Sequence, residues 1–475
     1  MSRINTNIGA LIAQTHLQRS NAELQTSLQR LSSGLRINRG ADDPAGLITS
    51  ESLRAEKAGI SQAITNSQRA SNVIATAEGA LNEVAALLVN IQELTIESAN
   101  TGVISPEEIQ ANQLQVDSAI ESITRISNTT SFAGLKLLDG SLAYVASGVN
   151  QTAIKDLNIY SVQFGTMPYL PVNISVTTSA QKGVLQYPTS VVTASCTIEV
   201  RGPVGVLTLP LKASASVSTI VQAINTTSDS TGVTASYINS ANPESGIAFK
   251  SSSYGSSEFV QVTALSGTFA VENEAGATVT RNEGRDVIAT INGISSKGDG
   301  LQLNFQSLGI DLDLTLTETF NKVGSTSFAI TKGGAKFQLG PAVNTNQQAN
   351  IGIRSVAASN LGNSVDGYLS DISTNGAYSL TKDVSRANRI VTQAIRQVSV
   401  LRGRLGAFEK NVLETNVNSL QITLENVTAS ESQIRDADFA AETSAMTRAQ
   451  ILNQAGTSVL KMANQTPQSV LSLLS

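Results

Sequence analysis

Residues 17–35 read LQRSNAELQTSLQRLSSGL, and this stretch decides how the N-terminal end of the chain folds. Its apolar residues recur in alternating steps of four and three, which is an a/d stripe and predicts a coiled-coil helix. An amphipathic helix on a globular core is the alternative, although such a core usually needs a wider stripe. The stripe consists of Leu17, Asn21, Leu24, Leu28, Leu31 and Leu35, and Asn21 is its one polar position.

An irregular segment follows this stripe. Residues 34–47 read GLRINRGADDPAGL. Here Asp42 and Asp43 precede Pro44, an order that predicts an N-cap followed by proline at the first helical position. We therefore predict a linker that includes Arg39, Asp42, Asp43 and Pro44, and a second helix that begins at Pro44.

The second helix is expected to be long, because residues 45–105 contain no proline and keep helical spacing. A helix of this length needs a partner along its apolar face. Ser105, Pro106 and Glu108 then form the pattern of a capping box, which predicts the start of a third helix. Residues 132–140 predict a short hairpin.

Helical spacing returns after Gly376, and the strongest heptad run of the chain lies there. The segment RDADF, residues 435–439, separates it from a second run that contains Leu452, Ala455, Val459 and Met462. Pro467 is expected to end the last helix. The predicted core of the first run is Val391, Val398, Leu401, Leu405, Phe408 and Val412.

The middle of the chain has a different chemistry. Residues 1–131 lack Phe, Tyr and Trp, whereas residues 145–335 are rich in Val, Thr, Ser and Gly and alternate as strands do. We expect the two similar ends to fold together as a helical stem. The middle is then an insertion of one or two β-rich domains, with a boundary near residue 280.

Composition excludes several classes of function. A net charge of −5 disfavours nucleic-acid binding. The single histidine, His16, rules out a zinc site built on paired histidines, and the single cysteine, Cys196, rules out an intrachain disulfide. No apolar run approaches the ~18–20 residues that span a bilayer, and the N-terminus does not resemble a cleavable secretory signal. We expect no cofactor, metal or catalytic site.

The two ends of the chain resemble bacterial flagellin. The resemblance rests on MSRINTNIGALIAQTHLQ at the N-terminus, on LSSGLRINRGADDPAGL, and on a C-terminal segment that starts at SLQITLENV and ends at VLSLL. It covers roughly residues 1–140 and 340–475. Residues 216–249 and 291–305 are similar to a motif inserted in some flagellins and hook-associated proteins.

This resemblance implies an α+β multi-domain fold, with an antiparallel long-helix coiled-coil stem formed by both ends and β-rich outer domains inserted. Residues 1–34 with 440–475 would form the inner tube of a filament. Residues 35–144 with 335–439, a helical stem with a hairpin, would form the outer tube. Residues 145–280 and 281–334 would be β-rich outer segments.

The implied function is that of a structural subunit that polymerises into the flagellar filament, outside the cell, after type III export. A hook–filament junction protein is the alternative, and a flagellin with an enzymatic insertion is a third reading that the missing catalytic residues disfavour. The implied partners are further copies of the chain, an export chaperone at the C-terminal segment, and hook-associated and cap proteins, with no nucleic acid or membrane. The expected polymerisation residues are Leu17, Leu24, Leu28, Leu31, Leu35, Leu452, Val459 and Met462.

The resemblance also bears on recognition by the host's Toll-like flagellin receptor. Relatives that activate it carry a stretch resembling Leu-Gln-Arg-Val-Arg-Glu-Leu, but residues 88–94 here read LVNIQEL. Amides therefore replace both arginines, which predicts weak recognition. Packing against a neighbouring subunit is the simpler role of this face. The residues expected to face the receptor are Asn90, Gln92, Glu93, Leu94 and Gln115.

Overall fold

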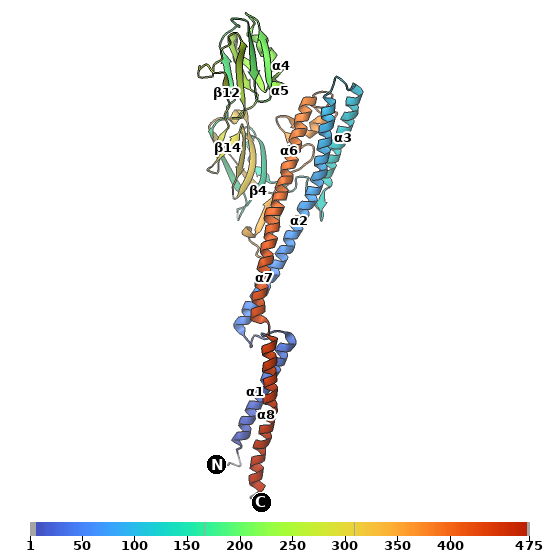
Figure 1. Ribbon diagram of the computed structural model, residues 1–475, viewed down its shortest axis with the longest axis vertical. Coiled ribbons are helices and arrows are strands. Elements are labelled where there is room, and N and C mark those ends of the chain that lie inside the picture. Colours follow the sequence, from blue (N-terminus) through green and yellow to red (C-terminus); the bar gives the residue numbers. More distant parts are fainter. Residues whose placement is uncertain (1–5, 166, 308, 473–475) are drawn as a thin grey trace. The chain divides into compact units, whose positions relative to one another are not determined.

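The computed structural model describes residues 6–165, 167–307 and 309–472 and shows an α+β multi-domain chain (Figure 1). Both ends are helical and the middle is rich in strands, as expected. The helices are α1 (Ile8–Ser33), α2 (Pro44–Ser98), α3 (Pro106–Thr129), α4 (Val217–Thr226), α5 (Ser228–Thr231), α6 (Val384–Phe408), the π-helix η4 (Glu409–Glu414), α7 (Thr415–Arg435) and α8 (Phe439–Ser472), with short 3-10 helices η1 (Glu318–Phe320), η2 (Thr345–Gln347) and η3 (Leu369–Ile372).

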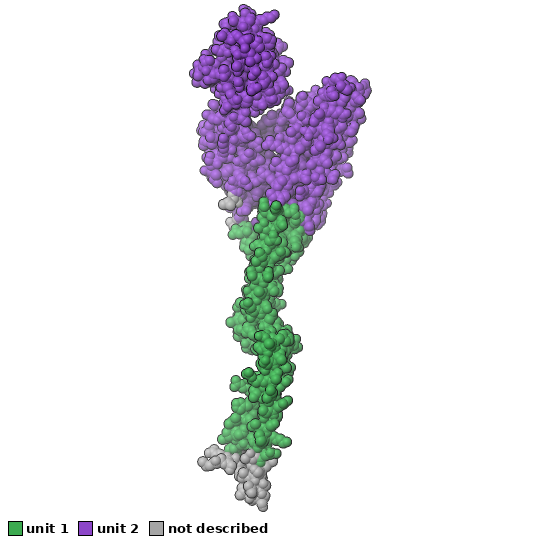
Figure 2. Space-filling model, viewed as in Figure 1, with its two compact units in different colours: residues 1–71, 338–347, 409–475 green, residues 72–337, 348–408 purple. Residues whose placement is uncertain are grey.

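The chain divides into two compact units (Figure 2). The first contains residues 1–71, 338–347 and 409–475, and the second contains residues 72–337 and 348–408. Each unit therefore draws on segments that lie far apart in the sequence.

Several local predictions are confirmed. Ser105 and Glu108 form a capping box at the start of α3, with Pro106 directly after the cap. The α2 helix begins at Pro44, and Asp43 accepts a hydrogen bond from the Gly46 N–H at 2.9 Å. The predicted hairpin is present as β1 (Ser131–Phe132) and β2 (Leu135–Lys136).

The expectation that Pro467 ends the last helix is wrong, because α8 continues to Ser472. A proline lacks the N–H that would bond the carbonyl four residues earlier, which here belongs to Ala463. That carbonyl instead accepts a hydrogen bond from Asn7 Nδ2 at 2.7 Å. A residue near the start of the chain therefore satisfies the group that the proline leaves open. Residues 473–475 lie outside the described residues.

The α2 helix buries residues in a strict seven-residue repeat, with steps that alternate between three and four. Such a repeat keeps one face in contact with its partners only if the helices wind around each other with a left-handed twist. The following residues are each exposed by 1% or less: Ile60, Ala63, Ser67, Ala70, Ile74, Ala77, Leu81, Val84, Leu88, Ile91, Thr95 and Ser98.

The expectation that no stretch is apolar enough to span a bilayer is wrong for α2. By length and composition the helix contains such an 18-residue stretch, of which 33% is buried within the structure. One helix of this kind says little about a membrane, because the core helix of a soluble protein has the same composition. The heptad pattern of buried residues accounts for the apolar content of α2.

One extra residue is accommodated between α6 and α7. The buried residues of α6 end with Leu401 and Leu405, but the next buried residue is Leu413, eight positions on instead of seven. The π-helix η4 spans this gap, and a π-turn takes in one residue more than an α-turn. Val412, which the heptad run placed in the core, is only half-buried, and Leu413 takes its place.

An eight-stranded sheet forms the larger β body, with the order β3-β17-β5-β13-β14-β15-β16-β4. It draws strands from both sides of residue 280 and buries apolar residues on one face. Its strands are β3 (Val145–Ser147), β4 (Ile154–Val162), β5 (Leu170–Thr178), β13 (Ile288–Ile291), β14 (Ile294–Asp299), β15 (Gln302–Gln306), β16 (Ile310–Leu316) and β17 (Gly324–Lys332).

A second β body, called the sandwich here, lies between β5 and β13 in the sequence. Two sheets, β6-β10-β9 and β12-β11-β7-β8, share its core with α4. Its strands are β6 (Val184–Tyr187), β7 (Cys196–Arg201), β8 (Val206–Leu211), β9 (Val233–Asn239), β10 (Asn242–Ser251), β11 (Phe259–Ser266) and β12 (Arg281–Glu283). Two small pairs complete the fold: β18 (Ala335–Gln338) with β19 (Gln348–Ile351), and β20 (Gly362–Asn363) with β21 (Gly367–Tyr368).

The chain enters and leaves the sandwich through a narrow neck. Gln181 and Arg285 exchange both backbone hydrogen bonds there, at 2.8 and 2.9 Å. The buried carboxylate of Asp286 accepts hydrogen bonds from the backbone N–H groups of Ser256 (2.8 Å) and Gly300 (3.0 Å). Burial raises the pKa of Asp286, but the hydrogen bonds from Ser256 and Gly300 outweigh it and leave the pKa below its ordinary value.

Candidate assembly surface

The helices α1 and α8 form an antiparallel pair along their length (Figure 1). Several contacts fix their register. In an antiparallel pair the numbers of two facing residues add up to a constant, and the sums for these contacts are nearly equal. These contacts are Asn7 with Ala463, Leu17 with Gly456, Asn21 with Asn453, Arg30 with Glu442, and Leu35 with Asp436.

Small residues recur every seven positions where the two helices meet. On α1 the buried residues are Ala13, Ser20 and Ser27. On α8, small residues with the same seven-residue spacing lie on the side that faces α1: Ala449, Gly456 and Ala463. A Cβ atom added at Gly456 would lie 3.4 Å from Leu17 Cδ1, so the leucine side chain already fills the space above the glycine. Large side chains of one helix thus pack onto small residues of the other, and the backbones approach closely.

The structure places the predicted leucine stripe partly in this contact. Leu17, Leu24 and Leu31 are half-buried, and so is Leu35 beyond the end of α1. Leu28 is 48% exposed and lies off the contact. The prediction followed the leucines and missed the small residues, although their seven-residue spacing is visible in the sequence.

One flank of α8 stays apolar and exposed. We call Leu452, Ala455, Val459 and Met462 the apolar flank. Each lies one position before a residue of the α1 contact, and the three larger side chains are exposed by 47% (Leu452), 48% (Val459) and 59% (Met462). The opposite flank, one position after the contact, is polar: Gln450, Gln454, Thr457 and Lys461. A contiguous apolar strip on one side of a helix typically marks a surface that another protein covers.

The exposed apolar surface of α1 lies mainly near its start. Ile8, Leu11 and Ile12 are each more than half exposed. They follow Asn7, whose Oδ1 caps the helix by accepting a hydrogen bond from the Ala10 N–H at 2.9 Å. This end of the helix therefore has a regular start and an uncovered apolar face.

The linker before α2 is ordered by its own side chains. Asp42 accepts hydrogen bonds from the N–H groups of Asn38 (2.9 Å) and Arg39 (2.8 Å). The hydrogen bonds from Arg39 and Asn38 lower the pKa of Asp42. Arg39 itself is exposed, and Pro44 begins α2.

The linker also pairs with the segment between α7 and α8. The Arg36 N–H donates to Arg435 O at 2.7 Å, and the Ala437 N–H donates to Gly34 O at 2.9 Å. The two connections of the stem thus run side by side, although 403 positions separate Gly34 from Ala437 and 399 positions separate Arg36 from Arg435.

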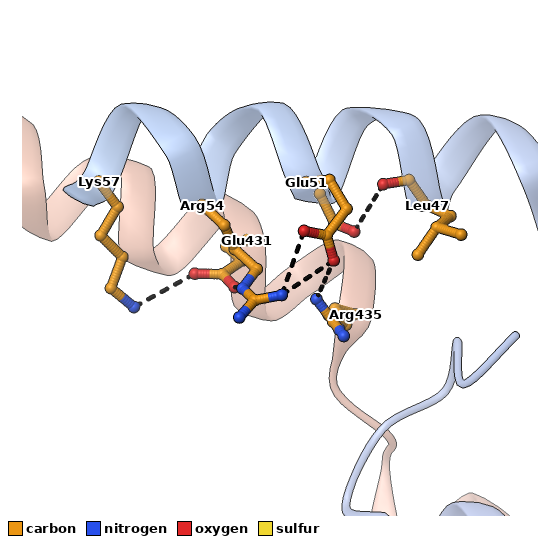
Figure 3. Close-up of polar contacts among 7 residues, drawn as sticks. Leu47, Glu51, Arg54, Lys57, Glu431 and Arg435 are labelled. Carbon is orange, nitrogen blue, oxygen red and sulfur yellow. Dashed lines mark hydrogen bonds and ion pairs between the residues drawn. The ribbon is translucent and has the colours of Figure 1, made fainter. Parts of the chain in front are cut away.

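Charged side chains join the start of α2 to the end of α7 (Figure 3). Glu51 accepts from Arg54 and from Arg435, each at 2.9 Å. Glu431 pairs with Lys57 at 3.2 Å. The Arg54 and Arg435 guanidiniums hold the pKa of Glu51 below its ordinary value. Because Glu51, Arg54 and Lys57 are about half exposed, solvent screens their pairs, and the cluster sets the alignment of the helices more than their stability.

The predicted stem core is buried along most of its length. Val391, Val398, Leu401 and Leu405 are buried in α6. Phe408 is half-buried and lies against Phe337, with ring centroids 6.0 Å apart.

The residues expected to face a receptor do not all reach solvent. Asn90, Glu93 and Gln115 are exposed and Gln92 is half-buried. Leu94 is only 8% exposed, so its placement on a receptor-facing surface is wrong. It falls close to the buried face of α2 that Ile91 and Thr95 define.

The described residues contain no cluster of His, Cys, Asp or Glu suited to a metal ion. His16 is exposed on α1, and Cys196 is buried in β7, where burial raises the pKa of its thiol.

Comparisons with known proteins point in one direction. Family models match at residues 4–143 (bacterial flagellin N-terminal helical region), 389–474 (bacterial flagellin C-terminal helical region) and 197–253 (flagellin hook IN motif). The chain is 30% identical to a flagellin of Salmonella typhimurium over 508 residues and 30% identical to flagellin A of Vibrio anguillarum over 486 residues. Both alignments cover 99% of each chain. A solved flagellar cap protein of Escherichia coli aligns with a TM-score of 0.30 and 18% identity, over 46% of this chain and 64% of that one.

Proposed function

This chain belongs to the bacterial flagellin family and is a subunit of the flagellar filament, and from that premise we propose that its terminal helices carry the contacts between subunits. The observation that carries the proposal is the exposed apolar flank of α8. The three large side chains of the flank remain about half exposed although α8 is already paired with α1 along its length. A neighbouring subunit in the filament is the partner that would cover it.

The energy available from this surface is appreciable. Complete burial of a Leu, Val or Met side chain is worth about 1.5–3 kcal/mol. The three large residues of the flank are about half exposed, so covering them contributes roughly 1 kcal/mol each. Leu28 and the exposed start of α1 add to the same effect. The proposed polymerisation residues are therefore Leu28, Leu452, Val459 and Met462, with Leu17, Leu24, Leu31 and Leu35 contributing through the α1–α8 pair.

We assign the layers of the filament from the same premise. Residues 1–34 with 440–475 form the inner tube, and residues 35–144 with 335–439 form the outer tube. Residues 145–280 and 281–334 form the outward β-rich part. The exposed apolar residues of α1 and α8, which need cover, support an inner position for the terminal pair.

The remaining roles also follow from the family. The filament lies outside the cell, so the subunit is secreted, and we assign its export to the flagellar type III route. An export chaperone covers the C-terminal segment in the cytosol, and hook-associated and cap proteins contact the filament. The family is one of structural proteins, and we propose that this chain has no catalytic activity.

The proposal is tested by placing a charge on the flank. Val459→Asp and Met462→Asp should abolish or strongly reduce filament formation, because contact would bury an unpaired carboxylate. Gln454→Asp adds the same charge on the polar flank of α8 and is the matched control. Sedimentation and electron microscopy measure assembly, and circular dichroism of the unassembled chains checks the fold. Normal filaments from both flank variants would refute the proposal.

Host recognition gives a separate prediction. We expect a weak response from the Toll-like flagellin receptor, because Asn90 and Gln92 lack the planar five-donor group of arginine. Asn90→Arg should raise the response at least about tenfold, the loss that removal of an interface arginine typically causes. A receptor reporter assay measures both proteins. Full potency of the unmodified chain, equal to that of a strongly activating flagellin, would contradict the prediction.

A further inference from the structure

A polar groove lies between the eight-stranded sheet and helix α6. Its volume is about 510 Å³. One wall is the outward face of β15, β16 and β4, and the other is one side of α6, completed by residues 354–361. All of these elements belong to the same compact unit. Nothing in the assembly proposed above makes use of this groove.

The alternation of the strands makes its sheet wall polar. In β16, Leu312 and Leu314 point into the core of the β body, so Asp311 and Asp313 point the other way, into the groove. The register places Asn304 of β15 and Asn158 of β4 on either side of Asp313. A row of amides and carboxylates therefore covers this face.

Part of the groove is held rigidly by contacts within the chain. Arg404 of α6 pairs with Asp311, and its guanidinium lies 3.5 Å from the ring centroid of Tyr160. The Tyr160 hydroxyl donates to Asp313 at 3.0 Å. Gln397 is committed too, because it accepts from the Gly362 N–H at 2.9 Å and donates to Gly362 O at 2.6 Å. Both acidic groups of the groove thus have partners.

Other polar side chains of the groove have none. Within the described part of the chain, Arg354, Arg396, Asn158 and Gln393 make no side-chain hydrogen bond or ion pair. The Arg396 guanidinium therefore remains for a ligand. That of Arg354 makes no ion pair, although burial raises the pKa of Asp313 and the charge of Arg354 acts to lower it. The groove therefore combines positive charge that is not held in an ion pair with amides that both donate and accept.

We propose that this groove binds an acidic saccharide, that is, a sugar that carries a carboxylate as well as hydroxyl groups. A guanidinium binds a carboxylate through two parallel hydrogen bonds. Each sugar hydroxyl both donates and accepts, which matches the side-chain amides of Asn158 and Gln393. A simple anion would leave the amides unused, and a neutral sugar would leave both arginines unpaired. The volume lies within the usual range for small-molecule sites, about 300–1,000 Å³.

Calorimetric titration of the full-length, unassembled chain tests the proposal with three probes. Glucuronate carries both chemical groups, acetate carries only the carboxylate, and glucose carries only the hydroxyls. Glucuronate should bind at least about tenfold more tightly than either of the others. Arg354→Gln and Arg396→Gln should each weaken glucuronate binding by a similar factor. Arg69→Gln removes an exposed arginine of α2 in the other unit and should change nothing.

The outcomes separate the alternatives. Equal binding of acetate and glucuronate would make the groove a simple anion site and overturn the proposal, and equal binding of glucose would overturn it in the same way. A loss of glucuronate affinity in Arg69→Gln as large as in Arg396→Gln would show a general effect of charge and would also overturn the proposal. An absence of binding heat with glucuronate would also refute it, provided that circular dichroism shows the chain to be folded. None of these results depends on filament formation. A failure of the saccharide proposal would therefore leave the proposed role of the terminal helices in assembly untouched.

Discussion

At the scale of single residues, Asn7 serves both terminal helices. Its Oδ1 caps α1 through the Ala10 N–H, and its Nδ2 bonds the carbonyl of Ala463. That carbonyl lacks its usual partner because Pro467 has no N–H. The sequence alone could predict the proline as a helix breaker. It could not show the compensation, because the compensating residue lies at the other end of the chain.

Two variants separate the two roles of Asn7. Asn7→Asp keeps an acceptor for the cap but loses the donor. The backbone amides of α1 should therefore keep their protection from hydrogen exchange, while those of the last turns of α8 lose theirs. Asn7→Ala removes both roles and should also weaken the start of α1 by about 1 kcal/mol. Hydrogen exchange of assembled filaments, read peptide by peptide, distinguishes the two. Unchanged exchange around Ala463 in both variants would mean that the Asn7 bond does not stabilise α8.

Asp286 gives the neck of the sandwich a defined dependence on pH. Its folded pKa lies below its ordinary value, so the carboxylate stabilises the fold at neutral pH. That contribution is complete above the unfolded pKa of about 4 and is lost as the pH falls through the lower folded pKa. Asp286→Asn should therefore be less stable than the unmodified chain at pH 7, and the difference should shrink as the solution is acidified below about pH 4. Urea unfolding across this pH range measures the difference in the free energy of unfolding between the two chains. If this difference stays constant with pH, the carboxylate is not its source.

At the scale of elements, the π-helix η4 reconciles two runs of buried residues that are out of step by one. The sequence predicted the run through Leu405 correctly and then placed Val412 in the core. A seven-residue rule that is continued from Leu405 cannot anticipate a single extra residue. The extra residue becomes visible only when the next run, which contains Leu413 and Leu420, is aligned on its own. The same rule missed Ala13, Ser20 and Ser27, because it gives weight to large apolar residues and these are small.

Removing the extra residue should be tolerated. Deletion of Lys410, which is exposed within η4, brings Leu413 into step with Leu405 and should turn η4 into ordinary α-helix at little cost in stability. Insertion of one alanine after Lys410 is the matched control. It turns Leu413 and Leu420 away from the buried face and should cost roughly 2–5 kcal/mol for each large side chain that leaves the core. Urea unfolding ranks the two chains, and a deletion as harmful as the insertion would contradict this account of η4.

At the scale of the whole molecule, the chain consists of helical ends with one β body nested inside another. The sequence predicted the helical ends and the inserted middle, because composition changes sharply between them. It could not reveal that strands before and after the sandwich share one sheet. That arrangement depends on pairing between β5 and β13, which more than 100 residues separate. Nor could it reveal the polar groove between the eight-stranded sheet and α6, whose walls come from four distant segments.

The nesting predicts that the sandwich is separable. Thr178 and Ile288 are partners in the pairing of β5 with β13, and Gln181 and Arg285 close the neck behind them. Replacing residues 182–284 by Asn-Gly, a sequence suited to a tight hairpin turn, should leave the eight-stranded sheet intact. The shortened chain should remain soluble and form filaments by electron microscopy. A chain that aggregates, or that loses the strand signal of the remaining sheet in circular dichroism, would show that the sandwich is needed for folding.

The hydrogen bond from Asn7 to Ala463 joins residues that are 456 positions apart. It forms only in a polypeptide whose synthesis has passed Ala463 and whose first residues have escaped proteolysis. A copy that has lost either residue would leave the other without its partner in this bond, at a half-buried position of the contact between α1 and α8. This bond is therefore confined to copies that keep both ends of the chain.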